Sequence, residues 1–305
     1  MKRTYAVIGL GYVGIELLIA IAKSHDVIGY DKSKQRISQL IQGFDSNGIV
    51  DKQTLHHSSL ELTDNINDIR KADFYIVTVP TPAFFYTLPD LKPLETASRE
   101  LAKIIKSGDI IVYESTVYPG ATEEICIPII EEVSGLACGT DFNVGYSPER
   151  INPKDKVHTL EKITKVAGAQ NTSTLKHITD LYEKICQSVH TVSSIKAAEA
   201  TKILENCQRD VNIAFINEFS KIMHTLNINT REVITAAKTK WNFVDFKPGL
   251  VGGHCISVDP LYLAFKAERH GMHTNLILAA RRVNDDMTHF IINEMFKYLV
   301  RLKVD

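Results

Sequence analysis

The stretch that decides the fold is Tyr5-Ala-Val-Ile-Gly-Leu-Gly-Tyr-Val-Gly14, close to the start of the 305-residue chain. Its first four residues are apolar, as in a buried strand, and three glycines follow in the pattern Gly-x-Gly-x-x-Gly before an apolar helical stretch. Gly9 permits a tight turn, Gly11 lets a ligand approach the backbone, and Gly14 lets helix and strand pack closely. The pattern therefore predicts a turn that binds the pyrophosphate of a dinucleotide; the alternative is that the glycines only bend the chain.

The residues after this turn indicate which dinucleotide is bound. The helix that begins around Tyr12 and Val13 offers free N–H groups to phosphate oxygens. Asp31 follows the second strand at the distance expected of a carboxylate that accepts hydrogen bonds from the adenosine ribose hydroxyls. A 2′-phosphate at that place would meet like charge, so the sequence favours NAD over NADP. The alternative interpretation is that Asp31 is only a turn residue.

The first half of the chain alternates short apolar runs with amphipathic helical patterns. Strands are expected at residues 5–8, 27–30, 75–79, 110–113 and 143–146, with further strands at 164–169 and 190–192. Strands that are apolar on both faces and separated by helices predict a parallel sheet covered on each side. We therefore expect an α/β fold, a doubly wound parallel-sheet Rossmann domain over residues 1–192.

The second half has a different pattern, and a chain of this length is expected to hold about two domains. Residues 194–226 contain neither proline nor glycine and should form one long helix with a polar stripe on one side, made of Glu199, Lys202, Asn206 and Arg209. Another long helix is expected from about residue 276 to the end. These patterns predict an all-helical central domain over residues 193–305.

Composition excludes several classes of partner. The net charge of -1 and pI of about 6.8 provide no basic field for nucleic acid or anionic lipid. No segment reaches the ~18 apolar residues of a membrane span. The N-terminal run imitates a signal peptide, but Glu16 and three glycines lie inside it. Five cysteines without close pairs argue against disulfides and favour a reducing compartment, so we expect a cytoplasmic protein.

Cys255, in Gly252-Gly-His-Cys-Ile256, is the candidate nucleophile. A lone cysteine is more often an inert buried residue. Here, however, two glycines before it would let a substrate approach the backbone, and Asp259 followed by Pro260 indicates the start of a helix. His254 and Cys255 are adjacent, and no second cluster of metal-ligating residues accompanies them. This spacing is poor for metal ligands, so no metal site is expected.

Five segments together resemble the UDP-glucose/GDP-mannose dehydrogenase family. They are Gly-Leu-Gly-Tyr-Val-Gly at 9–14, Val-Pro-Thr-Pro at 79–82, Ser-Thr-Val-Tyr-Pro-Gly at 115–120, Ser-Pro-Glu-Arg-Ile-Asn-Pro at 147–153 and Gly-Gly-His-Cys-Ile at 252–256. The resemblance covers nearly the whole chain in the family's order. Within the family, the fourth segment and residues 247–260 look most like the UDP-N-acetylhexosamine 6-dehydrogenases of bacterial surface polysaccharide synthesis, such as capsule.

The resemblance implies a double oxidation of a sugar C6 alcohol to the acid, with two hydride transfers to NAD. Cys255 would attack the intermediate aldehyde to give a thiohemiacetal, and the second oxidation would leave a thioester for water to cleave. It assigns oxyanion, water-positioning and acid–base roles to Lys202, Asn206, Asp259, Glu149 and Thr116. Without the motifs, Lys202 and Asn206 would be read as a solvated helix face, and Glu149 and Thr116 as a capped loop.

The resemblance also names binding positions. Arg36 would lie near the adenosine, and the strand-end loops near the cofactor would contribute Pro80, Thr81, Ser115 and Thr116. The substrate would contact Glu149, Arg150, Lys202, Asn206 and Gly252. Arg150 replaces a bulky apolar residue of the UDP-glucose enzymes and Val258 replaces their lysine, so the substrate expected is an N-acetylated sugar rather than UDP-glucose, of undecided epimer.

The end of the chain is the largest departure from the family pattern. Family members carry a further C-terminal α/β domain that grips the nucleotide, and we expect it to be missing after Asp305. The long central helix is the dimer core in relatives, so the resemblance implies a homodimer through that helix. The alternatives to an active UDP-N-acetylhexosamine dehydrogenase are a catalytically weak or silent NAD-binding fragment and a UDP-glucose 6-dehydrogenase. A β-hydroxyacid dehydrogenase of similar plan would leave Cys255 and its glycines unexplained.

Overall fold

The computed structural model describes residues 3–57, 60–84, 88–150, 157–252, 256 and 258–302. The chain divides into two compact units, one of residues 1–82 and 90–202 and the other of residues 83–89 and 203–305. The strands are β1 (Tyr5–Ile8), β2 (Val27–Tyr30), β3 (Glu61–Thr63), β4 (Phe74–Val77), β5 (Ala83–Phe84), β6 (Leu88–Pro89), β7 (Ile110–Tyr113), β8 (Asn143–Tyr146), β9 (Thr164–Ala169) and β10 (Ser188–Thr191).

The helices are α1 (Tyr12–Ala22), α2 (Lys34–Ile41), α3 (Lys52–His57), α4 (Lys92–Ala102), α5 (Ile127–Ser134), α6 (Thr172–Tyr182), α7 (Ile195–Thr225), α8 (Thr230–Ala237), α9 (Asp259–Glu268) and α10 (Asn275–Leu302). Shorter turns are the 3₁₀ segments η1 (Ile66–Lys71) and η3 (Leu160–Lys162), and the π-helical turn η2 (Thr122–Cys126).

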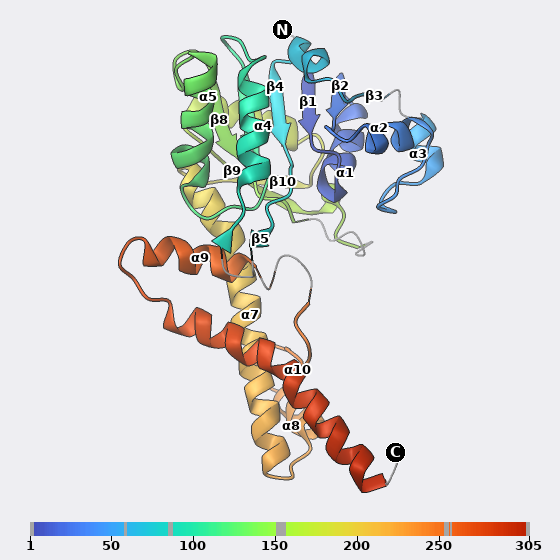
Figure 1. Cartoon of the computed structure of the whole chain (residues 1–305), viewed down its shortest axis with the longest axis vertical. Coiled ribbons are helices and arrows are strands. Elements are labelled where there is room, and N and C mark those ends of the chain that lie inside the picture. The colour runs from blue at the N-terminus through green and yellow to red at the C-terminus, as the bar shows by residue number, and fades with distance from the viewer. Residues whose placement is uncertain are drawn as a thin grey trace. The chain divides into compact units, whose positions relative to one another are not determined.

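The first unit is built on one eight-stranded sheet in the order β10-β9-β8-β7-β4-β1-β2-β3; Figure 1 shows β4, β1, β2 and β3 next to one another in that order. β1 is an interior strand, paired in parallel with β2 on one side and β4 on the other. Its four residues are all buried, as expected of a strand covered on both faces. The predicted doubly wound Rossmann fold is confirmed.

Helices cover both faces of the sheet. Val7, Phe74 and Val112 pack into one core with residues of α1 and α6. The opposite face carries Tyr113, whose hydroxyl lies 2.7 Å from the Ser98 hydroxyl of α4. Because neighbouring residues of a strand point to opposite faces, α4 lies on the side away from α1 and α6.

The structure adds the direction of one strand near the edge to the predicted sheet and corrects the bounds of two strands. β9 runs antiparallel to β8 rather than parallel, because the described part of its connection holds only the short turn η3 and no crossover helix. β4 covers Phe74–Val77 instead of residues 75–79, and β10 covers Ser188–Thr191 instead of 190–192. The sequence reading also missed β3 and the hairpin of β5 and β6, which are only two or three residues long.

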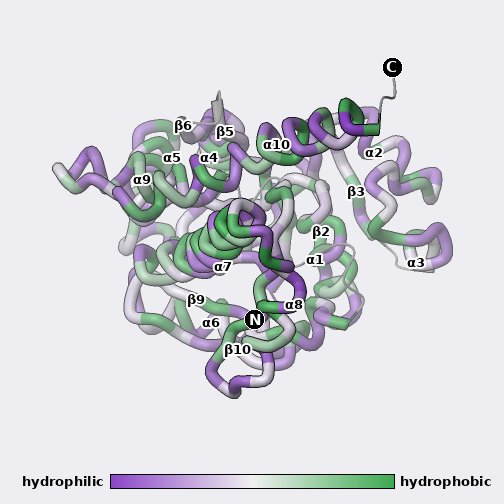
Figure 2. The backbone as a smooth tube through the Cα atoms, turned by 90° about the horizontal axis from the view of Figure 1, so that it is seen from below, coloured by the Kyte–Doolittle hydropathy of each residue, from purple (hydrophilic) through white to green (hydrophobic). Residues whose placement is uncertain are grey.

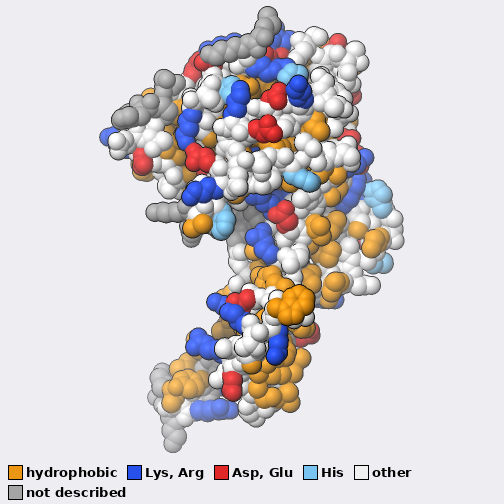
Figure 3. Space-filling model, turned by 180° about the vertical axis from the view of Figure 1, so that it is seen from behind, with side chains coloured by type: hydrophobic (Ala, Val, Ile, Leu, Met, Phe, Trp, Pro, Cys, Tyr) orange, Lys and Arg blue, Asp and Glu red, His pale blue; other side chains and the backbone are white. Residues whose placement is uncertain are grey.

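The second unit is mainly helical. The helix predicted at residues 194–226 is α7, and the helix predicted from about residue 276 is α10, in which hydrophilic and hydrophobic residues alternate along the length (Figure 2). Many hydrophobic side chains of this unit lie on its surface, as the lower part of Figure 3 shows. Three of them share one face of α7 at offsets of 11 and 18 residues, namely Leu204, Phe215 and Ile222, and Leu226 directly follows the end of this helix. Each of the four is between 49% and 67% exposed.

Candidate active site

The glycine turn joins β1 to α1 at the carboxyl edge of the sheet. Gly9 has a φ of +92°, a left-handed conformation that favours glycine. A Cβ on Gly14 would lie 1.9 Å from the carbonyl oxygen of Gly9, whereas a Cβ on Gly11 would have no atom within 4 Å. The turn therefore has no room for a side chain at Gly14, where helix and strand meet, but has free space beside Gly11. This free space would let a pyrophosphate reach the backbone at the start of α1.

Two side chains after β2 hold the middle of this turn through Leu10. Asp31 accepts the Leu10 amide at 2.8 Å and the Ser33 amide at 2.9 Å. Arg36 is 8% exposed, and its Nε donates to the Leu10 carbonyl at 2.8 Å while Nη1 pairs with Asp45 at 2.6 Å. Asp31 and Arg36 thus fix the backbone of the glycine turn, in addition to any contact with a nucleotide.

The neighbouring strand-end loops are joined to one another. Thr81 Oγ1 donates to the Thr116 carbonyl at 2.6 Å, and Ser115 Oγ donates to the Val79 carbonyl at 2.7 Å. Pro80 lies exposed between these contacts. Thr78, which the sequence reading missed, donates through Oγ1 to the Gly9 carbonyl at 2.6 Å and so ties the glycine turn to β4. The predicted cofactor residues after β1, β2, β4 and β7 therefore lie along one edge of the sheet.

Glu149, Arg150 and Lys202 come together at the first turns of α7. Lys202 is 6% exposed, and its Nζ donates to the carbonyl of Glu149 at 2.6 Å. Arg150 Nη2 donates in return to the Lys202 carbonyl at 3.2 Å, and Glu149 is itself 7% exposed. The solvated-face reading of Lys202 is wrong. In the predicted polar stripe only Arg209 is exposed, while the other three side chains are buried.

Lys165, Glu114 and Tyr182 form a buried triad that the sequence analysis did not predict. Lys165 of β9, 1% exposed, pairs with Glu114 at 2.8 Å, and the Tyr182 hydroxyl donates to the other oxygen of Glu114. Lys165 Nζ also lies 3.5 Å from the Pro148 carbonyl, next to Glu149. Glu114 directly precedes Ser115, so the triad lies at the base of both loops. A lysine within an otherwise apolar strand was the one available indication in the sequence.

In the second unit, Asn206 and Asp259 contact each other. Asp259 is the first residue of α9 and is 2% exposed, and its carboxylate accepts a hydrogen bond from the Asn206 amide. Arg209 donates to the oxygen of the same amide. The structure thus brings Asn206 and Asp259 together, and the amide of Asn206 is oriented by a partner on each side.

The glycine-rich segment is held by Asn217 of α7. Its side chain donates to the Gly249 carbonyl at 3.0 Å and accepts the Gly249 amide at 2.8 Å. Gly252 is exposed, and a Cβ there would have no atom within 4 Å. Cys255 and His254 lie outside the described residues.

Some features are not seen in the described part of the chain. No group of three or more His, Cys, Asp or Glu side chains there is placed to hold a metal ion. Over the same residues, no helix combines the length and apolar character needed to cross a membrane.

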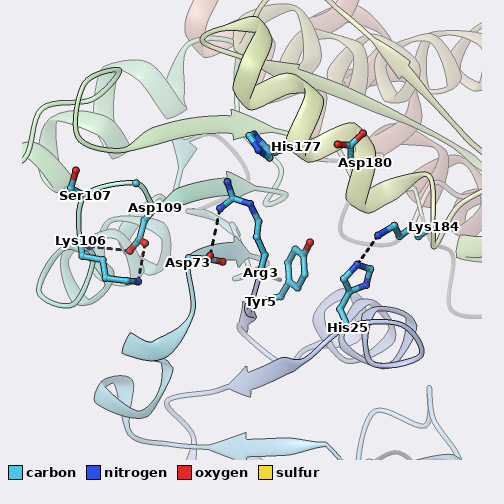
Figure 4. Close-up of a pocket in the computed structure, with 11 residues that line it drawn as sticks. Arg3, Tyr5, His25, Asp73, Lys106, Ser107, Asp109, His177, Asp180 and Lys184 are labelled. Carbon is cyan, nitrogen blue, oxygen red and sulfur yellow. Dashed lines mark hydrogen bonds and ion pairs between the residues drawn. The ribbon is translucent and has the colours of Figure 1, made fainter. Parts of the chain in front are cut away.

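A cavity of about 610 Å³ lies elsewhere in the first unit (Figure 4). Its wall includes residues just before β4 and β7, so it opens at the amino edge of the parallel strands. Several of its ionisable groups are paired: Arg3 lies 3.7 Å from Asp73, Lys106 lies 2.9 Å from Asp109, and Lys184 contacts His25 at 3.1 Å. Because it lies at the edge opposite the glycine turn, we do not assign it to the candidate site.

Known proteins match both units. The NAD binding domain of the UDP-glucose/GDP-mannose dehydrogenase family matches residues 3–186, and the central domain of that family matches residues 196–286. Protein CapL of Staphylococcus aureus is 51% identical over 99% of this chain, and UDP-N-acetyl-D-glucosamine 6-dehydrogenase of Pseudomonas aeruginosa is 48% identical over 98%. The chain spans 71% of the length of each.

A solved structure is similar throughout. The UDP-D-ManNAc dehydrogenase of Pyrococcus horikoshii superposes with a TM-score of 0.91 at 32% identity, over 99% of this chain and 72% of that one.

Proposed function

The chain belongs to the UDP-glucose/GDP-mannose dehydrogenase family, with NAD as its cofactor, and from that premise we propose that it oxidises the C6 alcohol of a UDP-N-acetylhexosamine to the uronic acid. The main support for this reaction is the buried Lys202 ammonium, which binds the carbonyl of Glu149. A cation held in a dry, fixed position stabilises a developing oxyanion far more than one in water does.

The residues that would hold NAD are those of the glycine turn, Asp31 and the loops at Thr81 and Ser115. When bound, NAD supplies the hydride acceptor for both oxidation steps. The open face at Gly11 and the start of α1 suit a pyrophosphate, and the Asp31 carboxylate after β2 suits ribose hydroxyls rather than a 2′-phosphate. A kcat/KM for NADP equal to or above that for NAD would contradict this assignment.

Cys255 is proposed as the nucleophile that captures the aldehyde as a thiohemiacetal and then carries the acyl group as a thioester. The four other thiols are poor competitors for this role. Burial raises the pKa of Cys138 to about 11, and that of Cys126, Cys186 and Cys207 to about 12. Near neutral pH these four are protonated, and the thiolate is the reactive form. Asn206 and Asp259 are proposed to orient the oxyanion and the hydrolytic water.

The decisive experiment is turnover by the chain with UDP-GlcNAc. We expect two NADH per sugar, abolished by Cys255→Ser and by alkylation with iodoacetamide, with Cys138→Ser as the matched control. Cys138 is the most exposed of the other cysteines, so its loss should leave the rate unchanged. NAD binding without any NADH formation would contradict the dehydrogenase and favour the silent NAD-binding fragment.

The substrate class rests on the relatives and on two residues. Identity to the UDP-N-acetyl-D-glucosamine 6-dehydrogenase, 48%, exceeds that to the UDP-D-ManNAc dehydrogenase, 32%. Arg150 and Val258 depart from the pattern of UDP-glucose enzymes, and Arg150 is bound to the start of α7. We expect kcat/KM to favour UDP-GlcNAc or UDP-GalNAc over UDP-glucose; a preference for UDP-glucose would overturn the choice.

We also propose a homodimer in the cytoplasm. The face of α7 formed by Leu204, Phe215 and Ile222 is exposed and apolar, a pattern that marks an interaction surface. The described cysteines are free thiols, which fits a reducing compartment. Phe215→Asp should halve the mass measured by light scattering, while Glu218→Gln on the same helix should leave it unchanged.

A further inference from the structure

Glu199 is a buried acid with no role in the chemistry described above. It lies in the second turn of α7 and is 0% exposed. One carboxylate oxygen accepts the Gly120 amide at 2.5 Å, and the other accepts the Thr122 amide at 3.0 Å. Each oxygen therefore binds a different backbone amide.

These two amides lie at the far end of the loop that carries Thr116. The near end is fixed by the Ser115 hydroxyl on the Val79 carbonyl and by the Tyr146 hydroxyl, which donates to the Ser115 carbonyl at 3.1 Å. The far end turns at Gly120, whose φ is +99°, and enters η2. Glu199 holds this far end through its two hydrogen bonds. Thr116 therefore lies in a loop that is fixed at Ser115 on one side and at Gly120 and Thr122 on the other.

The same helix holds the second loop three residues further on. Lys202 binds the Glu149 carbonyl at 2.6 Å, and residues three apart project from neighbouring positions of one helix side. Two side chains of α7 thus hold two loops. The Glu199 carboxylate binds amides of the Thr116 loop, and the Lys202 ammonium binds a carbonyl of the Glu149 loop. The relative placement of Thr116 and Glu149 then depends on both contacts.

The two contacts of Glu199 require an ionised carboxylate. Burial raises the pKa of Glu199 to about 7, although the hydrogen bonds from Gly120 and Thr122 lower it. The charged groups nearby are Glu123 and Glu124 of η2 and Lys196 of α7, whose Nζ is 3.5 Å from Glu123 and 4.0 Å from Glu124. The buried Cys126 thiol, with a pKa of about 12, stays neutral. A protonated Glu199 carries an O–H on one oxygen and can no longer accept two amides equally well.

We propose that Glu199 is a positioning residue whose ionised carboxylate fixes the Thr116 loop against α7, so that this loop is ordered above neutral pH and loosened below it. The proposal rests on the proposed function for the role of Thr116. The anchoring itself concerns only described residues of the first unit.

The first test is amide hydrogen exchange of the whole chain at pH 6 and pH 8, expressed as protection factors. In the wild type, protection of the Gly120 and Thr122 amides should be about tenfold higher at pH 8, since each bond to a charged acceptor is stronger than one to a neutral acceptor. Glu199→Gln has one acceptor oxygen and an NH₂ donor, so the pH difference should vanish. Glu205→Gln, which alters an exposed acid of the same helix, should behave as wild type.

The second test is the pH profile of NADH formation. Wild-type kcat should fall below about pH 7, and Glu199→Gln should be reduced by about a hundredfold at pH 8, the size of effect that a small misplacement of catalytic groups produces, with a flatter profile. Wild-type protection that does not change with pH, or a Glu199→Gln profile that parallels the wild type, would overturn the proposal. If the chain forms no NADH at all, the dehydrogenase fails, and the exchange result alone decides the anchoring.

Discussion

The two units hold their buried polar side chains in different ways. In the first unit, charged side chains bind the backbone of loops: Glu199 binds two amides, Lys202 a carbonyl, and Arg36 the carbonyl of Leu10. In the second unit, side chains bind side chains of other helices, as in Asp210 with Arg281 and Asn217 with Asn284, and Asn217 also binds the backbone of Gly249. The interior of a helix satisfies its own backbone groups, whereas a loop leaves more of them for side chains to bind. A change at Glu199, Lys202 or Arg36 should therefore disturb a loop. A change at Asp210 should disturb helix packing, and a change at Asn217 should disturb both.

The largest loss of stability is expected at Lys165. This side chain forms a buried ion pair with Glu114 and also lies next to the loop that carries Glu149. Lys165→Met leaves the Glu114 carboxylate buried without its cation, and removing one partner of a buried pair costs about 3–5 kcal/mol of unfolding free energy. Urea denaturation followed by circular dichroism measures this loss.

Two variants decide whether the cost comes from the unpaired charge. Glu114→Gln together with Lys165→Met should recover most of the stability, because no buried charge is left unpaired. Lys71→Met removes a cation whose partner Glu61 is exposed, and should cost no more than about 1 kcal/mol. A double variant as unstable as Lys165→Met alone would mean that lost packing is the cause.

A smaller effect is expected in the second unit at Asn217. Asn217→Ala removes both bonds to Gly249 and leaves Asn284 without one partner, at a cost of about 1–3 kcal/mol for groups left unsatisfied in a buried site. The Gly249 amide should exchange faster with solvent, and amides of β1 in the first unit should not change.

Asn212→Ala is the matched control, since the Asn212 side chain binds only a carbonyl of its own helix in the described contacts. Equal exchange of Gly249 in the two variants would show that Asn217 does not hold this segment.

The sequence was informative where local chemistry decides the structure. The glycine turn, the central strands and the long helix α7 follow from residue spacing, because their geometry depends on neighbours in the chain. The family resemblance also named Asn206 and Asp259 as site residues, but their contact with each other was not predicted. A strand of three residues such as β3 is too short for any periodicity to reveal.

Contacts between distant residues could not be predicted in this way. Glu114 and Lys165 are separated by 51 residues, and Glu199 and Gly120 by 79. The lysine within β9 indicates an unusual position but does not identify its partner, and the burial of Lys202 depends on the loop that covers it. These contacts depend on the path of the chain between the elements, which residue spacing does not specify.

The smallest effect concerns the pH dependence of two aspartates, one from each region. Burial would raise the pKa of Asp45, but hydrogen bonds from Arg36 and from three loop amides outweigh burial and lower it. Burial raises the pKa of Asp210 despite Arg281 and Asn284. Asp45 therefore contributes stability that is present above the unfolded pKa of 3.8 and is lost as the pH falls through its folded value. The ionisation of Asp210 opposes folding as the pH rises above 3.8.

The test compares melting temperatures between pH 3 and pH 6 for the wild type, Asp45→Asn and Asp210→Asn. The difference between wild type and Asp45→Asn should grow with pH, because only the ionised form gains the loop amides. The difference between wild type and Asp210→Asn should instead shrink with pH, each by no more than about 2–4 °C, which corresponds to about 1 kcal/mol in a domain of roughly 200 residues. The contrast between the two aspartates requires that the amides of a loop stabilise a buried carboxylate better than the side chains of a neighbouring helix do. If both differences in melting temperature changed in the same direction with pH, that requirement would not be met.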